Sequence, residues 1–274
     1  MKPINNNTFY SDAIRKTFPY AWNVRAPIIP GGVCPVFLCD TPEGTIVCRF
    51  SSYNIAYRNK TLGDLLYTYN IPAPRTCVHL YGGRWFESYE YCPEQTLCEH
   101  MYHGISDKQM FDVYKQIIKI QKQISDIPVS LFKPIACKDM HQVFVENQRM
   151  RVQPTLARVY GAVHKLFSNH GEQRLFHNDL DPRNVLVDDY GNLTKLIDLD
   201  AIAVCNESFS VMMMLRVCPL KNRSELMDIY EDTMQRKINR PAITGGLKIL
   251  NAIRAPQVAL NRLLWHGYNT PPRR

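Results

Sequence analysis

The sequence predicts an α+β fold in which a small antiparallel β-sheet precedes a mostly helical region. Short runs of β-branched and aromatic residues, separated by turn residues, fill the first ninety positions of the 274-residue chain. Beyond Pro93 the apolar residues recur with the period of an α-helix. The chain is 45% hydrophobic and 21% charged, so it can form a sizeable core and is not disordered throughout.

The N-terminal region is predicted as β-rich from apolar runs that alternate with turn signals. Pro42, Gly44 and the Gly82-Gly83 pair mark two tight turns between such runs. Asn70 and Pro72 end a short helical segment between the two turns. The predicted elements are strands over 36–39 and 45–50, a helix over 62–69, and strands over 78–81 and 85–91.

The C-terminal region is predicted as helical, interrupted by one small hairpin. Ser106 can cap a helix whose broad apolar stripe runs from Met110 to Ile124. A second helix is expected at about 155–167, a hairpin is expected from strands 184–187 and 193–198, and the region after 205 is expected to be helical. The chain is therefore divided into a β-rich part, 1–92, and a helical part, 93–274, with a hinge near 90–93.

Charge and cysteine content exclude several classes of protein. The formal net charge of +8 suits an anionic partner or simple solubility, and no run of five basic residues suggests a nucleic-acid-binding arm. No apolar stretch is long enough to span a membrane, and the N-terminus lacks the apolar core of a signal peptide. The nine cysteines include no C-x-x-C pair and fit reduced thiols in a cytoplasmic protein. We therefore expect neither nucleic acid nor a membrane as a partner.

The segment with the most chemical information runs from His177 to Asn184 and is followed by Asp198. Asp179 and Asn184 precede the predicted hairpin and Asp198 ends it, so the three side chains should converge. Two oxygen ligands suit Mg²⁺, and the remaining carboxylate could accept a proton from an attacking hydroxyl group. Such a site would serve phosphoryl transfer. Asp, Asn and Pro also favour ordinary loops, but this combination and spacing favours function.

Two patterns in this segment resemble the aminoglycoside phosphotransferase and choline kinase family. They are H-x-D-x-x-x-x-N, which begins at His177, and I-D-x-D, which begins at Ile197. The resemblance extends from about residue 25 to about residue 205. It implies a bilobal protein-kinase-like fold, with a small antiparallel β-sheet N-lobe and a mostly helical C-lobe.

The resemblance also implies roles for individual residues, with ATP and Mg²⁺ as cofactors. Asp179 would be the catalytic base, His177 would brace its loop, and Asn184 and Asp198 would ligate Mg²⁺. Arg49 stands where most relatives have a phosphate-binding lysine, and choline kinases resemble this chain in having arginine there. The other nucleotide-binding residues would be Gly31 and Gly32 in the phosphate loop and Glu90, Tyr91 and Cys92 in the hinge that pairs with adenine.

The chain departs from the family pattern in the helix after Arg49. That helix should offer a glutamate to pair with Arg49, but Arg58, Asn59 and Lys60 stand near the expected place and the only acid is Asp64. Without this acid, Arg49 would be less firmly oriented. Glu94 also stands where relatives often have glycine after the hinge.

The charge of the C-terminal region bears on the acceptor. Residues 201–274 hold eleven Lys or Arg and five Asp or Glu, which argues against a polycationic acceptor unless acids such as Asp181, Asp200 and Glu207 line its site.

Three functions follow from these observations. The favoured one is ATP- and Mg²⁺-dependent transfer of the γ-phosphate to a hydroxyl group of a small molecule. A catalytically silent nucleotide-binding scaffold is motivated by the missing helix acid. A protein-modifying kinase or nucleotidyl transferase is compatible with the same superfold. The acceptor and the oligomeric state are left open.

Overall fold

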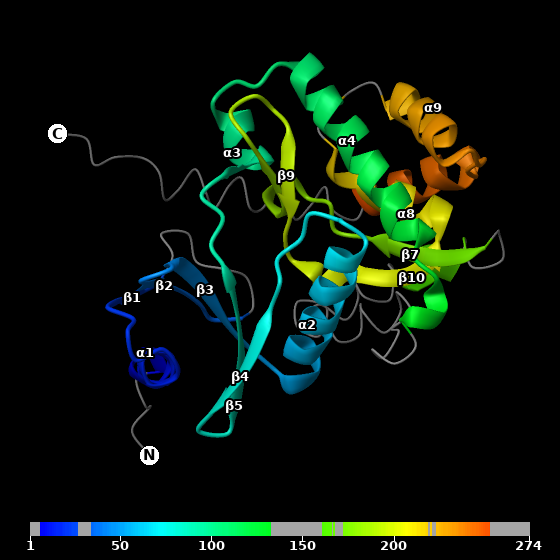
Figure 1. Ribbon diagram of the computed structural model, residues 1–274. Helices are drawn as coiled ribbons and strands as arrows, with labels where there is room; N and C mark the ends of the chain where they lie inside the picture. The colour runs from blue at the N-terminus through cyan, green and yellow to red at the C-terminus, as the bar shows by residue number, and fades with distance from the viewer. Residues whose placement is uncertain are drawn as a thin grey trace.

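The computed structural model describes residues 6–26, 34–132, 161–165, 167, 172–218, 220 and 223–252. An antiparallel five-stranded sheet lies at one end of the molecule and most of the helices lie at the other (Figure 1). The strand order in this sheet is β1-β2-β3-β5-β4. The elements of this part are α1 (Asn6–Thr17), β1 (Asn23–Arg25), β2 (Val36–Thr41), β3 (Gly44–Ser51), α2 (Tyr53–Thr68), β4 (Cys77–Tyr81) and β5 (Arg84–Glu90).

Both hairpins predicted for the N-terminal part are present. β2 pairs with β3 and β4 pairs with β5, each in antiparallel register. Gly82 and Gly83 both have positive φ, which is the conformation of the tight turns that suit the twist of a hairpin.

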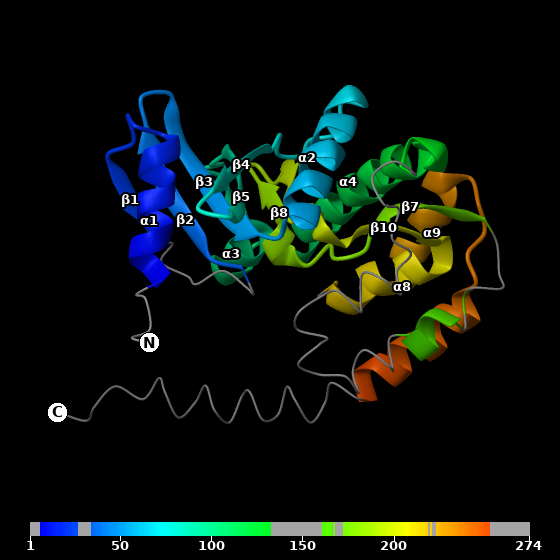
Figure 2. The same cartoon turned by 90° about the horizontal axis from the view of Figure 1, so that it is seen from below.

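Helix α1, which covers the sheet, was not predicted from the sequence. Tyr10, Ala13 and Ile14 of this helix are buried in a small core with aromatic residues of the strands, among them Phe50 and Phe86. Figure 2 shows α1 lying against the sheet on the side away from α2. The helix predicted over 62–69 was too short, because α2 begins at Tyr53, where Ser52 accepts a hydrogen bond from the backbone N–H of Ile55.

The C-terminal part contains helices packed around two short sheets. β7 pairs with β10, and β8 pairs with β9 as the predicted hairpin. The prediction of helices after residue 205 is confirmed, but strand β10 was not predicted. The elements are β6 (Gln95–Thr96), α3 (Leu97–Tyr102), α4 (Asp107–Asp126), η1 (Val129–Leu131), β7 (Gln173–His177), η3 (Pro182–Asn184), β8 (Val185–Val187), β9 (Leu193–Leu196), η4 (Leu199–Ala201), β10 (Ile202–Asn206), α8 (Glu207–Val217) and α9 (Arg223–Met234), and residues 240–252 are helical as well.

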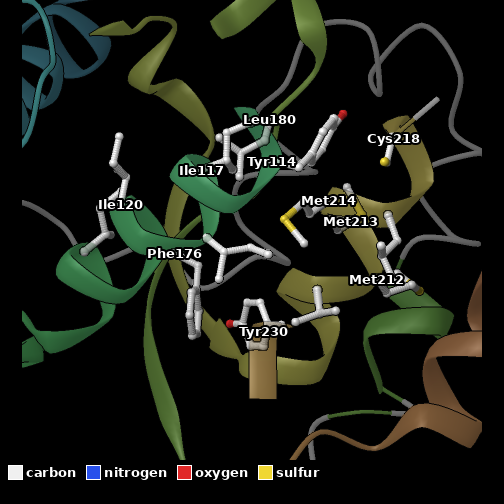
Figure 3. Packing of buried hydrophobic residues seen from close by; sticks show 14 of the residues in the cluster. Tyr114, Ile117, Ile120, Phe176, Leu180, Met212, Met213, Met214, Cys218 and Tyr230 are labelled. Atoms are coloured by element: carbon white, nitrogen blue, oxygen red, sulfur yellow. The ribbon is translucent and has the colours of Figure 1, made fainter. Parts of the chain in front are cut away.

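Helix α4 is the central support of this part. Ser106 and Gln109 form the capping box that the sequence predicts, and the apolar stripe of α4 is buried. Figure 3 shows Tyr114 and Ile117 of α4 packed close to Phe176 of β7 and Met214 of α8. This core holds β7, and therefore the segment that follows it, in place.

Of the helix predicted at about 155–167, only residues 161–165 and 167 are described, and these are helical. The division of the chain between residues 92 and 93 stays a prediction. Within the described ranges, every helix is too short or too polar to cross a lipid bilayer.

Candidate active site

The segment from His177 to Asn184 forms a loop between β7 and β8. Asp181 caps the short helix η3, since its Oδ1 accepts from the backbone N–H of Arg183 at 3.1 Å. Pro182 occupies the first turn of η3, where a missing N–H does no harm. The loop is therefore held at both ends, by β7 and by η3.

His177 is buried beneath this loop. Its Nδ1 accepts from the backbone N–H of Asp179 at 3.3 Å, and its Nε2 lies 3.4 Å from the carbonyl oxygen of Ile197. Burial lowers the pKa of His177, so the ring is neutral and Nε2 carries the proton that it donates to Ile197. His177 thus connects the loop to the strand end that precedes Asp198.

A glutamine of α4 holds the backbone of His177. Gln121 Nε2 donates to the His177 carbonyl oxygen at 2.9 Å, and the His177 N–H donates to Gln121 Oε1 at 3.1 Å. Gln121 is itself buried. The main helix of the C-terminal core therefore sets the position of the loop directly.

Asp179 lies at the surface of the loop, with 42% of its side chain exposed. Asn184 Nδ2 donates to the Asp179 carbonyl oxygen at 2.9 Å and to its Oδ2 at 3.2 Å. The other carboxylate oxygen, Oδ1, lies 3.7 Å from Nη2 of Arg216 on α8. No motif in the sequence points to Arg216.

The structure brings Asn184 and Asp198 together. The Ile197 N–H donates to the Asn184 carbonyl oxygen at 2.9 Å, next to Asp198 in the chain. Asp198 has left-handed backbone angles, φ 59° and ψ 67°, which are uncommon for a residue other than glycine and cluster at functional sites. These residues offer hard oxygen atoms that fit Mg²⁺. Among the described residues, no group of three or more His, Cys, Asp or Glu could hold a metal ion. The candidate ligands Asn184 and Asp198 are one amide and one carboxylate.

Arg49 on β3 faces this candidate metal site. Its Nη1 lies 3.5 Å from Asp198 Oδ1 and 3.4 Å from Glu87 Oε1, and its Nη2 forms an ion pair with Asp200. Arg49 is not a solvent-exposed charge at the edge of the strand, because only 16% of its side chain is exposed.

The helix α2 contributes amide and guanidinium groups to the same cluster. Asn59 Nδ2 donates to both carboxylate oxygens of Glu87 and, at 2.8 Å, to Asp200 Oδ1. Arg58 donates to the carbonyl oxygens of Asp200 and Ile202. Asp64, the one acid expected in this region, pairs instead with Lys60 at 2.6 Å.

The acids around Arg49 have shifted pKa values. Burial raises the pKa of Glu87 to about 7, although the nearby charge of Arg49 opposes this. Burial also acts to raise the pKa of Asp200, but the charge of Arg49 and the hydrogen bonds from Arg49 and Asn59 outweigh it and lower the pKa. Asp200 is therefore the firmly ionised partner of Arg49 in this structure.

The hinge residues lie at the end of β5. Glu90 is opposite Ile46 in the sheet, and its side chain is exposed with Lys195 Nζ 3.9 Å from Oε2. The Tyr91 N–H donates to the carbonyl oxygen of Thr45 at 3.0 Å, so this amide is already used within the protein. The Cys92 thiol lies 3.8 Å from the carbonyl oxygen of Glu90. Gly31 and Gly32 lie outside the described residues.

Comparison with known proteins gives the fold. No protein-family model and no curated protein sequence matches the chain. The GDP and kanamycin complex of APH(2")-IIIa superposes with a TM-score of 0.66 at 16% identity, over 88% of this chain and 87% of that one.

Two further solved structures have the same architecture. Spectinomycin phosphotransferase APH(9)-Ia, in complex with ADP and spectinomycin, superposes with a TM-score of 0.59 at 13% identity, over 88% of this chain and 84% of that one. Macrolide 2'-phosphotransferase MphH from Brachybacterium faecium superposes with a TM-score of 0.56 at 16% identity, over 98% of this chain and 100% of that one. As the resemblance of its catalytic segment implied, this chain has the kinase-like fold of the aminoglycoside and macrolide phosphotransferases.

Proposed function

We propose that the protein is a phosphotransferase that moves the γ-phosphate of ATP to a hydroxyl group of a small molecule in a Mg²⁺-dependent reaction. One observation carries the proposal. Asn184 contacts Asp179 and the residue that precedes Asp198, and Nη1 of Arg49 lies 3.5 Å from Asp198 Oδ1. The kinase-like fold, which other small-molecule phosphotransferases share, supports this function.

Each residue of the site would have a defined task. Asp179 would accept the proton of the acceptor hydroxyl, while Asn184 holds one of its carboxylate oxygens. His177 would brace the loop, since both of its ring nitrogens are in use. Arg49 would bind nucleotide phosphate through its bidentate guanidinium group. Gly31, Gly32 and the hinge residues Glu90, Tyr91 and Cys92 would complete the nucleotide site.

Asn184 and Asp198 would hold Mg²⁺. The amide nitrogen of Asn184 donates to Asp179, so the donor set leaves its Oδ1 for a cation. When bound, Mg²⁺ would supply positive charge against the phosphate oxygens.

We further propose that the acceptor is neutral or anionic rather than a cation such as choline or an aminoglycoside. The three acids that could attract a cation already have arginine partners. Asp181 pairs with Arg183 at 2.8 Å, Asp200 pairs with Arg49, and Glu207 pairs with Arg236 at 3.4 Å. A cationic acceptor would have to compete with these arginines.

The nucleotide and metal sites can be tested together by thermal unfolding. We expect ATP or GTP with Mg²⁺ to raise the melting temperature of the native chain, because a ligand at 100 times its Kd stabilises by about 2.7 kcal/mol. Asp198→Asn should lose the Mg²⁺-dependent part of this rise. Asp179→Asn should keep it, yet abolish phosphate transfer to any acceptor that the native protein uses.

The control for charge is Asp189→Asn, an exposed acid in the turn between β8 and β9. This variant should behave like the native protein in both measurements. The absence of any nucleotide-dependent shift in the native chain would contradict the proposal and favour the silent scaffold. Full transfer activity in Asp179→Asn would refute the assignment of the base.

A further inference from the structure

Arg49 is oriented by an acid that the sequence pattern does not place there. We propose that Glu87, on strand β5, is the positioning residue for Arg49 and replaces the missing acid of helix α2. This inference rests on the proposed nucleotide site, because orienting Arg49 matters only if Arg49 binds phosphate.

The sheet register places the two residues side by side. Arg49 on β3 is directly opposite Glu87 on β5, so both side chains project from the same face. Their closest atoms, Nη1 and Oε1, are 3.4 Å apart, and only 1% of the Glu87 side chain is exposed. A carboxylate buried to this degree is costly unless it is paired, and Arg49 is its cationic partner.

Asn59 on α2 supports the pair of Arg49 and Glu87 and does not compete with it. Asn59 Nδ2 donates to Glu87 Oε1 at 3.2 Å and to Oε2 at 3.0 Å. It also donates to Asp200 Oδ1, so an acid at position 59 would place a third carboxylate against two others. The amide at position 59 and the acid at position 87 are therefore complementary.

Glu87 differs from the other two acids around Arg49. Asp198 belongs to the candidate metal site and Asp200 lies two residues further along, so a bound nucleotide and cation would compete for both. Glu87 is covered by protein on a strand adjacent to β3 and stays beside Arg49 whatever occupies the site. Because this partner is in the sheet, the pairing of β3 with β5 keeps it beside Arg49, and α2 supports the pair through Asn59. The missing helix acid is then no evidence for a silent scaffold.

Binding of ATP with Mg²⁺ to the full chain, measured by isothermal titration calorimetry, tests this role. We expect Glu87→Gln to weaken binding at least tenfold at pH 8, above the pKa of Glu87, although the substitution then removes a negative charge near the phosphates. The double variant Glu87→Gln/Asn59→Glu moves the acid from the strand to the helix, and we expect it to recover affinity to within about threefold of the native value. A purely structural role for Glu87 would not predict that recovery.

Glu43→Gln is the matched control, since Glu43 is an exposed glutamate in the turn between β2 and β3 of the same sheet. It should bind ATP as the native chain does. If Glu87→Gln does not fold, Glu87→Asp, which keeps the charge but shortens the reach, should show weaker binding. Native affinity in Glu87→Gln or Glu87→Asp, or no recovery in the double variant, would overturn the positioning role alone. No binding by the native chain would overturn the proposed function as well.

Discussion

Arg216 is the residue at the candidate site that most distinguishes it from an acidic cation-binding pocket. Its Nη2 lies 3.7 Å from Asp179 Oδ1, and only 9% of its side chain is exposed. The sequence pattern identified Asp179, Asn184 and Asp198 because they form a motif of defined spacing. An arginine on a helix belongs to no such motif, and its neighbour is known only from the packing of α8 against the loop.

A charge beside the base should select among acceptors. At about 8 Å and an effective dielectric constant of about 20, two unit charges interact by about 2 kcal/mol, and solvent screening reduces this. We therefore expect Arg216→Gln to raise kcat/KM for an amino form of the acceptor, relative to its carboxylate form, by about tenfold. Coupled assays of ADP release with glucosamine, glucose and glucuronate, and with matched forms of any acceptor found by screening, measure this ratio.

Lys237→Gln removes the same charge from an exposed side chain that pairs with Glu231 after α9, and it should leave the ratio unchanged. A native preference for the amino form would contradict a neutral or anionic acceptor. The same ratio in Arg216→Gln would mean that Arg216 does not select among acceptors.

At the scale of elements, the helices that the sequence located well are those with uninterrupted apolar stripes, such as α4. The start of α2 was missed because the buried face of this helix carries Arg58 and Asn59, which break the apolar period and are buried only because they meet Asp200 and Glu87. Strand β10 was missed because its pairing partner, β7, lies elsewhere in the sequence. By contrast, α1 carries a readable signal in Tyr10, Ala13 and Ile14, which have helical spacing and are buried.

The packing of the helical segment 240–252 can be tested at two adjacent glycines. A Cβ at Gly246 would lie 2.4 Å from Met212 Sδ and 3.5 Å from the ring of Phe167, whereas a Cβ at Gly245 would meet nothing within 4 Å. Gly245→Ala should stabilise by about 0.5–1 kcal/mol through helix propensity. Gly246→Ala gains the same helix propensity, but overpacking against Met212 lowers its free energy of unfolding by about 1–3 kcal/mol.

In urea, the free energy of unfolding of Gly245→Ala should therefore be higher than that of the native chain. The free energy of unfolding of Gly246→Ala should be about 2 kcal/mol lower than that of Gly245→Ala. Equal stability of the two variants would mean that segment 240–252 does not pack on α8 as described.

At the scale of the whole molecule, the candidate site depends on contacts between the sheet end and the helical end. Arg49 from β3 and Arg58 and Asn59 from α2 all donate hydrogen bonds to the segment 198–202. The composition of the chain and its local patterns predicted a β-rich part, a helical part and the catalytic motif. They did not predict this junction of β3 and α2 with residues 198–202, because the residues that form it are far apart in sequence. Hydrogen bonds between buried polar groups join them, and such bonds leave no local pattern in the sequence.

Arg58 is the residue through which this junction can be tested. Its Nη1 donates to the Asp200 carbonyl oxygen at 2.8 Å and its Nη2 donates to that of Ile202. Arg58→Met would keep much of the side-chain volume but leave the Asp200 carbonyl without this donor. Hydrogen bonds of charged groups contribute about 1.5–3 kcal/mol each, so we expect the free energy of unfolding in urea to fall by about 2–4 kcal/mol.

Lys60→Met, on the same helix with 43% of its side chain exposed, should change stability by less than about 1 kcal/mol, because exposed ion pairs contribute little. If Arg58→Met were as stable as Lys60→Met, α2 would not hold the two ends of the molecule together through residues 200 and 202. A large loss in Arg58→Met with a lower urea slope would indicate that the two ends had begun to unfold separately, since the slope reports the surface exposed in one cooperative step. The strand-borne contact between Glu87 and Arg49 would then be expected to survive in the sheet, because it needs no residue of α2 to place the two side chains opposite each other.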